Sequence, residues 1–341
     1  MLYVGSKEDI SRLFHYIKEL TPPSSIIGYK VQEGSVVFGA LERPEELVLG
    51  LPPRIPQFSP KYILLPPEHV LVHVNRDYAV TTKHQVAGSI VLFGIKPCDL
   101  LAMRILDCIL MARHPVYTST RGSLKLIVAE ECLRPLETCF CGDVKAGPLI
   151  EDHCDIAYAI VGDTVFFKAL SGAGLGILRD LRLSTPGEKE LEKYMEASRI
   201  ATERASGKIP VPLALRKELV DKTARVDLWR DVSRKCLACG SCNYVCPTCF
   251  CIELEDMLQG DGEAARVAKW IGCRTYTYGL VAGGHFRREL YTRYRHFVLH
   301  KFVFYEKQVG RTGCVGCGRC TTWCPAGIDL KESLREVSRW K

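Results

Sequence analysis

The chain has 341 residues, enough for two domains, and its composition of 47% hydrophobic and 25% charged residues is that of an ordinary soluble globular protein. No apolar run reaches the roughly 18 residues that a membrane-spanning helix needs, and the N-terminal stretch MLYVGSKEDI lacks the apolar core of a signal peptide. These features exclude a membrane-spanning or secreted protein and predict a cytoplasmic location, while the net charge of +7 leaves nucleic-acid binding open.

The first half of the chain predicts helices and strands in alternation. Apolar residues at helical spacing predict a helix over residues 7–20. Residues 25–41 predict two strands joined by a Glu-Gly turn, and short apolar runs at 89–95 and 124–130 predict buried strands. We expect a helix that begins near Cys98 between these two runs.

The next segments complete this domain and lead out of it. Residues 155–170 predict a hairpin with a Gly-Asp turn. The glycine-rich stretch 171–177 lacks the G-x-G-x-x-G pattern of a nucleotide site and predicts a loop. The order of elements predicts an α+β or α/β domain over residues 1–180, followed by a charged helical connector over 181–228.

Seventeen cysteines are bunched in the chain, and most of them follow residue 229. The odd count, the chain length and the missing signal peptide favour metal ligation in a reducing compartment over a disulfide framework. Two copies of Cys-x2-Cys-x2-Cys-x3-Cys-Pro stand out, at 236–247 and at 314–325. In this pattern three cysteines hold one cubane cluster, and the fourth ligates the other cluster.

This crossed pattern predicts two [4Fe–4S] clusters. The first is expected on Cys236, Cys239, Cys242 and Cys324, and the second on Cys314, Cys317, Cys320 and Cys246. Zinc or packed free thiols are the alternatives, but a zinc ion needs only four tetrahedral ligands and has no use for two crossed motifs. An oxidised cluster with four thiolates carries about −2, so the basic side chains would compensate for buried anions.

A long insertion over residues 247–313 separates the two motifs. Part of it, CIELEDMLQ at 251–259, has apolar residues near one helical face. This pattern favours a helical two-cluster ferredoxin domain over residues 229–341 instead of the small β-rich type.

Four cysteines of the first domain are candidates for a third cluster: Cys98, Cys132, Cys139 and Cys141. Cys98 lies at a predicted helix start, where the helix N-terminus and Lys96 favour a thiolate. Cys132 follows the next strand, and two adjacent parallel strands would bring the two loops together. The alternative is that these thiols are buried small hydrophobic side chains. Cys108 and Cys154 are expected only to pack in the core.

Three further cysteines lie outside both motifs: Cys249, Cys251 and Cys273. His285 is a candidate fourth ligand, because His replaces Cys in some iron–sulfur centres. These residues form a further cluster site, or they are core thiols beside the ferredoxin motifs, and the sequence leaves both interpretations open.

Several long strings of the chain resemble one group of proteins. They are FGIKPCDLLAMRILD, CLRPLETCFCG, DLWRDVSRKCLACGSCNYVCPTCFC, AGGHFR and CVGCGRCTTWCPAGI. The chain resembles the beta subunit of archaeal cytosolic sulfhydrogenases and the corresponding iron–sulfur subunit of anaerobic sulfite reductase, most strongly over residues 90–141 and 229–328. The resemblance implies the four candidate cysteines of the first domain alongside the two ferredoxin motifs, which favours a third cluster.

The resemblance also implies an electron-transfer subunit of a hetero-oligomeric complex. Its partners would be a flavin subunit that handles NAD(P)H and a catalytic subunit with nickel–iron or sirohaem, and the resemblance does not choose between these two. The residues show no Ser/His/Asp pattern and no acid–base carboxylate pair, so no catalytic residue is assigned. The alternative is a heterodisulfide-reductase-like subunit that acts on a disulfide or sulfur substrate at a special cluster. No nucleic-acid partner is expected.

Overall fold

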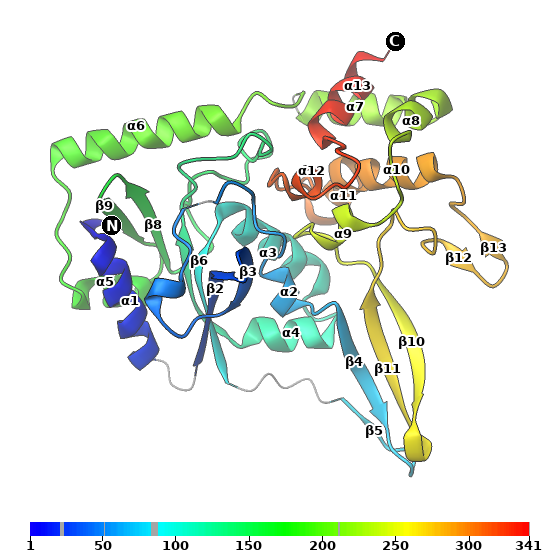
Figure 1. Cartoon of the computed structure of the whole chain (residues 1–341), viewed down its shortest axis with the longest axis horizontal. Coiled ribbons are helices and arrows are strands. Elements are labelled where there is room, and N and C mark those ends of the chain that lie inside the picture. The colour runs from blue at the N-terminus through cyan, green and yellow to red at the C-terminus, as the bar shows by residue number, and fades with distance from the viewer. Residues whose placement is uncertain (21–23, 51, 83–87, 211, 341) are drawn as a thin grey trace.

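The computed structural model describes residues 1–20, 24–50, 52–82, 88–210 and 212–340. An α/β part, a projecting β-arm and a helical part can be followed in Figure 1. The fold class predicted from the sequence, an α+β N-terminal region followed by a two-cluster ferredoxin region, is confirmed.

A central sheet organises the first part of the chain. Seven of the described strands form it in the order β1-β9-β8-β7-β6-β2-β3. These strands are β1 (Leu2–Ser6), β2 (Ser24–Gln32), β3 (Ser35–Ala40), β6 (Ser89–Ile95), β7 (Leu124–Glu130), β8 (Ile156–Val161) and β9 (Thr164–Ala169). The pairs β2–β6, β6–β7 and β7–β8 are parallel, whereas the pairs towards both edges are antiparallel. The carboxyl ends of β6 and β7 therefore open at one edge of the sheet, as predicted.

Helices cover both faces of this sheet. The elements on the two faces are α1 (Lys7–Leu20) and α5 (Gly172–Asp180) on one, and α2 (Lys61–Leu64), α3 (Pro97–Leu110) and α4 (Pro115–Gly122) on the other. Successive strand residues point to opposite faces, so Phe93 packs with Phe14 of α1 while Leu92 packs with Leu106 of α3. A 3-10 turn (Pro44–Glu46) follows β3.

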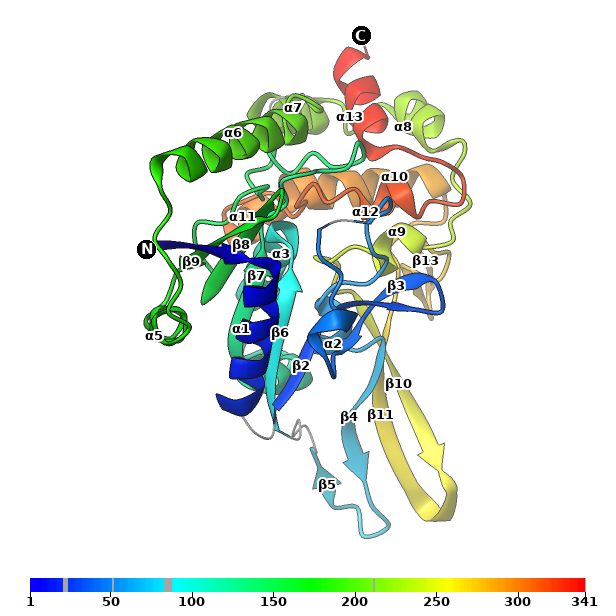
Figure 2. The same cartoon turned by 60° about the vertical axis from the view of Figure 1, so that its left-hand side comes forward.

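A second sheet forms the β-arm, which projects from the body of the molecule in Figures 1 and 2. Its order is β10-β11-β4-β5, built from β10 (Ile252–Gln259), β11 (Glu263–Trp270), β4 (Glu68–Val74) and β5 (Val80–Thr81), with a 3-10 turn at Gly260–Gly262. The helix expected over 251–259 is therefore wrong. Ile252, Leu254 and Leu258 stand at even spacings, which fit one face of a strand as well as one side of a short helix.

The remaining elements are mostly helical. They are α6 (Glu188–Ala205), α7 (Pro212–Asp221), α8 (Val226–Ser233), α9 (Ser241–Tyr244), α10 (Leu290–Leu299), a π-helical turn (His300–Phe304), α11 (Tyr305–Val309), α12 (Arg319–Thr322) and α13 (Leu330–Arg339), with a small hairpin of β12 (Leu280–Val281) and β13 (Gly284–His285). Figure 2 shows α8 close to α10, and α13 close to α7 and α8. In the described residues no helix is both long and apolar enough to cross a membrane.

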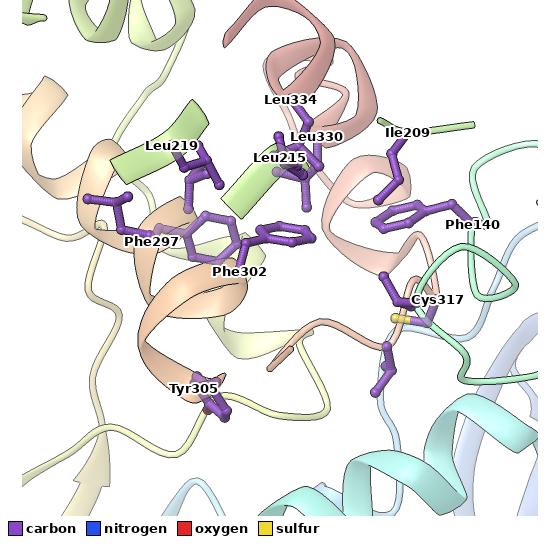
Figure 3. Packing of buried hydrophobic residues seen from close by; sticks show 14 of the residues in the cluster. Phe140, Ile209, Leu215, Leu219, Phe297, Phe302, Tyr305, Cys317, Leu330 and Leu334 are labelled. Carbon is purple, nitrogen blue, oxygen red and sulfur yellow. The ribbon is translucent and has the colours of Figure 1, made fainter. Parts of the chain in front are cut away.

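One apolar cluster joins the helical part to the loops that carry cysteines (Figure 3). Phe297 and Phe302 pack there with Leu215, Leu219 and Leu334. Phe140 and Cys317, which belong to two cysteine-bearing loops, lie at the end of the same cluster. Burial of these rings fixes the two loops relative to the helices.

Two smaller expectations fail. The glycine-rich stretch 171–177 is not a loop but opens α5, because Ser171 Oγ accepts a hydrogen bond from the Gly174 amide at 3.0 Å and caps the helix. Cys108 is exposed and is not a core residue, whereas Cys154 is buried as expected.

Candidate iron–sulfur centres

The first four-cysteine set, site A, is Cys236, Cys239, Cys242 and Cys324, which line one cavity. Three of them lie on the chain around α9, which turns sharply at Gly240 with φ of 74°. The fourth comes from the second motif. The structure thus brings together the residues of the crossed assignment for the first cluster.

Site B is Cys314, Cys317, Cys320 and Cys246, which line a second cavity with Lys301 in its wall. Cys246 again comes from the other motif. Burial raises the pKa of Cys314 to about 12, and it raises the pKa of Cys242 in site A to about 12 as well. These thiols therefore ionise at neutral pH only when a cation such as iron lies beside them.

Site C is Cys98, Cys132, Cys139 and Cys141, which line a third cavity between the ends of β6 and β7. Cys98 is in the first turn of α3, Cys132 follows β7, and the other two lie on the next loop. The structure brings all four candidate residues of the first domain together.

Lys96, which was predicted to favour a Cys98 thiolate, has a carboxylate partner. Its Nζ lies 2.8 Å from Glu130 Oε2, and both side chains are buried. Burial raises the pKa of Cys98 well above its usual value, and the neighbouring Asp99 raises it further. A helix start and a nearby lysine in the sequence were therefore not enough to predict a lowered pKa for Cys98, because the lysine is paired with a carboxylate.

Sites B and C touch each other through their backbones. The Phe140 amide donates a hydrogen bond to Gly316 O at 2.8 Å. A Cβ atom at Gly316, whose φ is +61°, would lie 2.6 Å from the Phe140 carbonyl carbon and 2.6 Å from the Cys141 amide nitrogen. Only glycine permits this approach, which brings the two cysteine loops into direct contact.

A buried ion pair also links the sheet to the second motif. Arg319 Nη1 donates to Asp99 Oδ1 at 2.8 Å, and Tyr29 donates its hydroxyl hydrogen to Asp99 Oδ2 at 2.7 Å. Arg319 and Asp99 are fully buried. These residues adjoin Cys320 and Cys98 in sequence, so the pair fixes site B against site C.

The last candidate set is only partly assembled. Cys249 and Cys273 both accept hydrogen bonds from Asn243 Nδ2, at 3.6 and 3.1 Å. Burial, with Cys251 nearby, raises the pKa of Cys273 to about 11. His285 has other partners: its Nε2 is 2.6 Å from Tyr276 O, and its Nδ1 accepts from the Arg287 amide at 3.0 Å. The three thiols are together, and His285 is occupied elsewhere.

Basic side chains are buried around these sites. The buried lysines and arginines are Lys61, Lys96, Arg274, Arg293, Lys301, Arg319 and Lys331. Arg274 Nη2 donates to Cys236 Sγ of site A at 2.9 Å, and its guanidinium carbon lies 3.8 Å from the centre of the Tyr294 ring. The net positive charge predicted such compensation of buried anions, but these residues are scattered along the chain, and only the fold brings them together.

The cysteine ligands of these sites fit a metal cluster instead of a single metal ion. No three His, Cys, Asp or Glu side chains in the described part of the chain are close enough to hold a single metal ion. Instead, four thiols surround each of three internal cavities. Four cysteines about a small cavity are the ligand set of a [4Fe–4S] cluster.

Comparison with known proteins agrees with this geometry. Residues 235–328 match the family model of a 4Fe-4S dicluster domain. The chain is 31% identical over 287 residues to sulfhydrogenase 2 subunit beta of Pyrococcus furiosus, a match that spans 80% of this chain and 83% of that protein. The chain belongs to the sulfhydrogenase beta-subunit family. As a member of this family with a dicluster domain, it is an iron–sulfur electron-transfer subunit with at least two [4Fe–4S] clusters, and the resemblance noted in its sequence is confirmed.

Proposed function

We propose that this chain relays electrons through three [4Fe–4S] clusters at sites A, B and C between two partner subunits. The observation that carries the proposal is that neighbouring sites have a cysteine in common in the walls of their cavities. Cys317 lines the cavities of both site B and site C, and Cys320 lines those of both site A and site B. The three sites therefore adjoin in the order C, B, A.

When bound, the clusters supply one-electron transfer at potentials that the protein tunes. The chain's own residues provide the thiolate ligands, exclude water and supply charge. Arg274 directs an N–H group to a site A sulfur, and Lys301 brings a buried ammonium beside site B. Hydrogen bonds to sulfur and nearby positive charge both favour the reduced cluster.

The two ends of this line differ at the surface. At site A, Cys239 is exposed and its neighbour Leu237 is 66% exposed, which suits contact with a redox partner. At site C, Pro97 and Pro148 separate the cavity from an open cleft of about 550 Å³. We infer that one partner approaches each end, and that these partners are a flavin subunit using NAD(P)H and a catalytic subunit with nickel–iron or sirohaem.

The division of the chain at residues 180 and 228 also stays a prediction. We propose 1–180 as the domain of site C, 181–228 as a helical connector, and 229–341 as the dicluster domain. The β-arm draws β4 and β5 from the first of these and β10 and β11 from the third, so separate expression of either segment is expected to expose strand edges.

A Cys141→Ser variant of the intact complex tests the relay. Electron transfer from NAD(P)H to the terminal acceptor should fall at least about tenfold, because a break in the line removes a carrier. Each partner should keep its own half-reaction with an artificial dye. An unchanged overall rate in a variant that has lost the site C cluster signal would show that electrons do not pass through site C. Cys108→Ser, at an exposed thiol outside all sites, is the matched control.

A second function, reduction of a disulfide or sulfur substrate at a special cluster, is favoured by the group formed by Cys249, Cys251 and Cys273 next to Asn243. Disulfide reduction by the isolated chain with reduced viologen would support it. Activity that appears only in the complex would count against it.

A further inference from the structure

A buried polar group binds two thiols beside site B, and a third thiol lies close by. The single Asn243 amide nitrogen donates to Cys249 Sγ and Cys273 Sγ, and the side chain is 3% exposed. The first strand pair of the β-arm brings Cys251 to the same place, since the Ile271 amide donates to Cys251 O at 3.0 Å. Residues 249 and 251 thus meet residue 273 at the base of the arm.

Two buried lysines face this group. Lys61 and Lys301 are 3% and 2% exposed, and neither has a carboxylate within 4 Å among the described residues. Lys301 Nζ donates to Thr248 Oγ1 at 2.7 Å, and Lys61 Nζ donates to Tyr244 O at 3.2 Å. Their ammonium groups repel each other, so a buried pair of this kind needs anions close by.

The nearest groups that can carry this negative charge are sulfurs. Burial lowers the pKa of Lys61 to about 8, while Cys249, Cys246 and Cys251 act to raise it. Lys301 also lines the cavity of site B, together with Cys246. Cys246 belongs to site B, whereas Cys249 and Cys251 do not, so the three-thiol group shares these lysines with site B.

We propose that Cys249, Cys251 and Cys273 ligate a fourth iron–sulfur cluster, site D, beside site B. The proposal rests on the proposed function only in taking sites A and B as clusters. Three thiolates occupy three corners of a cubane and leave one iron without a cysteine. His285 is not the fourth ligand, because both of its ring nitrogens have other partners.

Site D adjoins the relay at one point. The Cys249 amide donates to Cys246 O at 3.3 Å, so Cys249 of the proposed cluster and Cys246 of site B lie on one tight turn of the chain. Site D is therefore a side branch at site B and not part of the line from C to A.

Iron and acid-labile sulfide counts on anaerobically purified complex test site D. Cys251→Ser and Cys273→Ser should each lose about four irons per chain, since a cubane holds four. The Cys251→Ser/Cys273→Ser double variant should lose no more than either single variant, because all of these changes remove the same cluster. Cys154→Ser, at a buried thiol outside every site, should lose none. Cys249 is left intact because it contacts Cys246 of site B.

Unchanged iron in both single variants, losses that add in the double variant, or zinc in place of iron would each overturn site D. EPR spectra of the same samples should retain the signals of sites A and B. This readout separates the two proposals. A wild-type count below about 12 irons would contradict the proposed three-cluster relay, whereas a failure of site D alone leaves about 12 irons and the signals of sites A, B and C in the wild type and in every variant.

Discussion

Sites A and B are built differently from site C. Sites A and B come from two short loops of one sequence pattern, and each loop contributes one cysteine to the other site. Site C comes from the ends of two parallel strands and a later loop, so its cysteines spread from residue 98 to 141. Assembly of site A therefore requires site B, and assembly of site B requires site A. Assembly of site C instead requires the central sheet and its contact with the second motif.

Loss of a crossing cysteine has the largest expected effect. Cys324→Ser should remove the cluster of site A, about four irons per chain, and it should also weaken site B because the second motif loses its anchor. Cys132→Ser should remove the site C cluster and leave the EPR signals of A and B intact. If Cys324→Ser left site B as stable to a chelator as in the wild type, the interdependence of A and B would be wrong.

The buried ion pair between Arg319 and Asp99 comes next. Arg319→Met leaves a buried carboxylate without its partner, and such a change costs about 3–5 kcal/mol. The free energy of unfolding, measured by denaturant titration, should fall by about this amount. Site C should also no longer be held at a fixed position relative to site B. The matched control Arg199→Ala removes an exposed helical ion pair and should change stability little. Equal stability of the two variants would contradict the proposed link.

Acid should destabilise the protein through two buried histidines of the helical part, His296 and His300. Burial lowers the pKa of both His296 and His300 to about 4, with help from Arg287 and Lys301 respectively. The unfolded histidines titrate near 6.5, so between pH 6.5 and 4 the unfolded state binds more protons and stability falls as the pH falls. The slope of unfolding free energy against pH over this window should decrease in a His296→Gln/His300→Gln variant. An unchanged slope would show that these rings are not the source.

The smallest effect is expected from Arg274. Arg274→Leu removes an N–H group donated to Cys236 Sγ and a buried positive charge. Both changes destabilise the reduced state of the site A cluster. Its reduction potential should therefore become more negative in an EPR-monitored redox titration. The potential of site C should not move, and Arg230→Leu at an exposed arginine is the control. A shift of equal size at both sites would indicate a global change instead.

The sequence predicted sites A and B because their spacing is local, so eight cysteines at fixed intervals define two crossed loops without knowledge of the fold. Site C could be predicted less directly, through strand ends that become neighbours only if β6 and β7 pair in parallel. The β-arm could not be predicted. The spacing of Ile252, Leu254 and Leu258 suits either a helix or a strand, and the pairing of β10 with β11, which itself pairs with β4, decides it.

The buried basic side chains around the cysteine sites could not be predicted from the sequence either. Lys61 and Lys301 are 240 positions apart in the sequence and become neighbours only through the arm and the π-helical turn. His285 followed a plausible pattern, but its ring is bound by the backbone of its own hairpin. Cys108 stood at an apolar helical spacing and yet faces solvent, because α3 is buried more deeply at its N-terminal end.

The iron and acid-labile sulfide content of the anaerobically purified wild-type chain, with Mössbauer spectra of the same sample, tests the central claim most directly. Clusters at sites A, B and C predict at least about 12 irons per chain in [4Fe–4S] form, and site D raises the number to about 16. A count of about eight would leave site C as a group of packed thiols and break the proposed line of three clusters. A count below eight would contradict the relay itself.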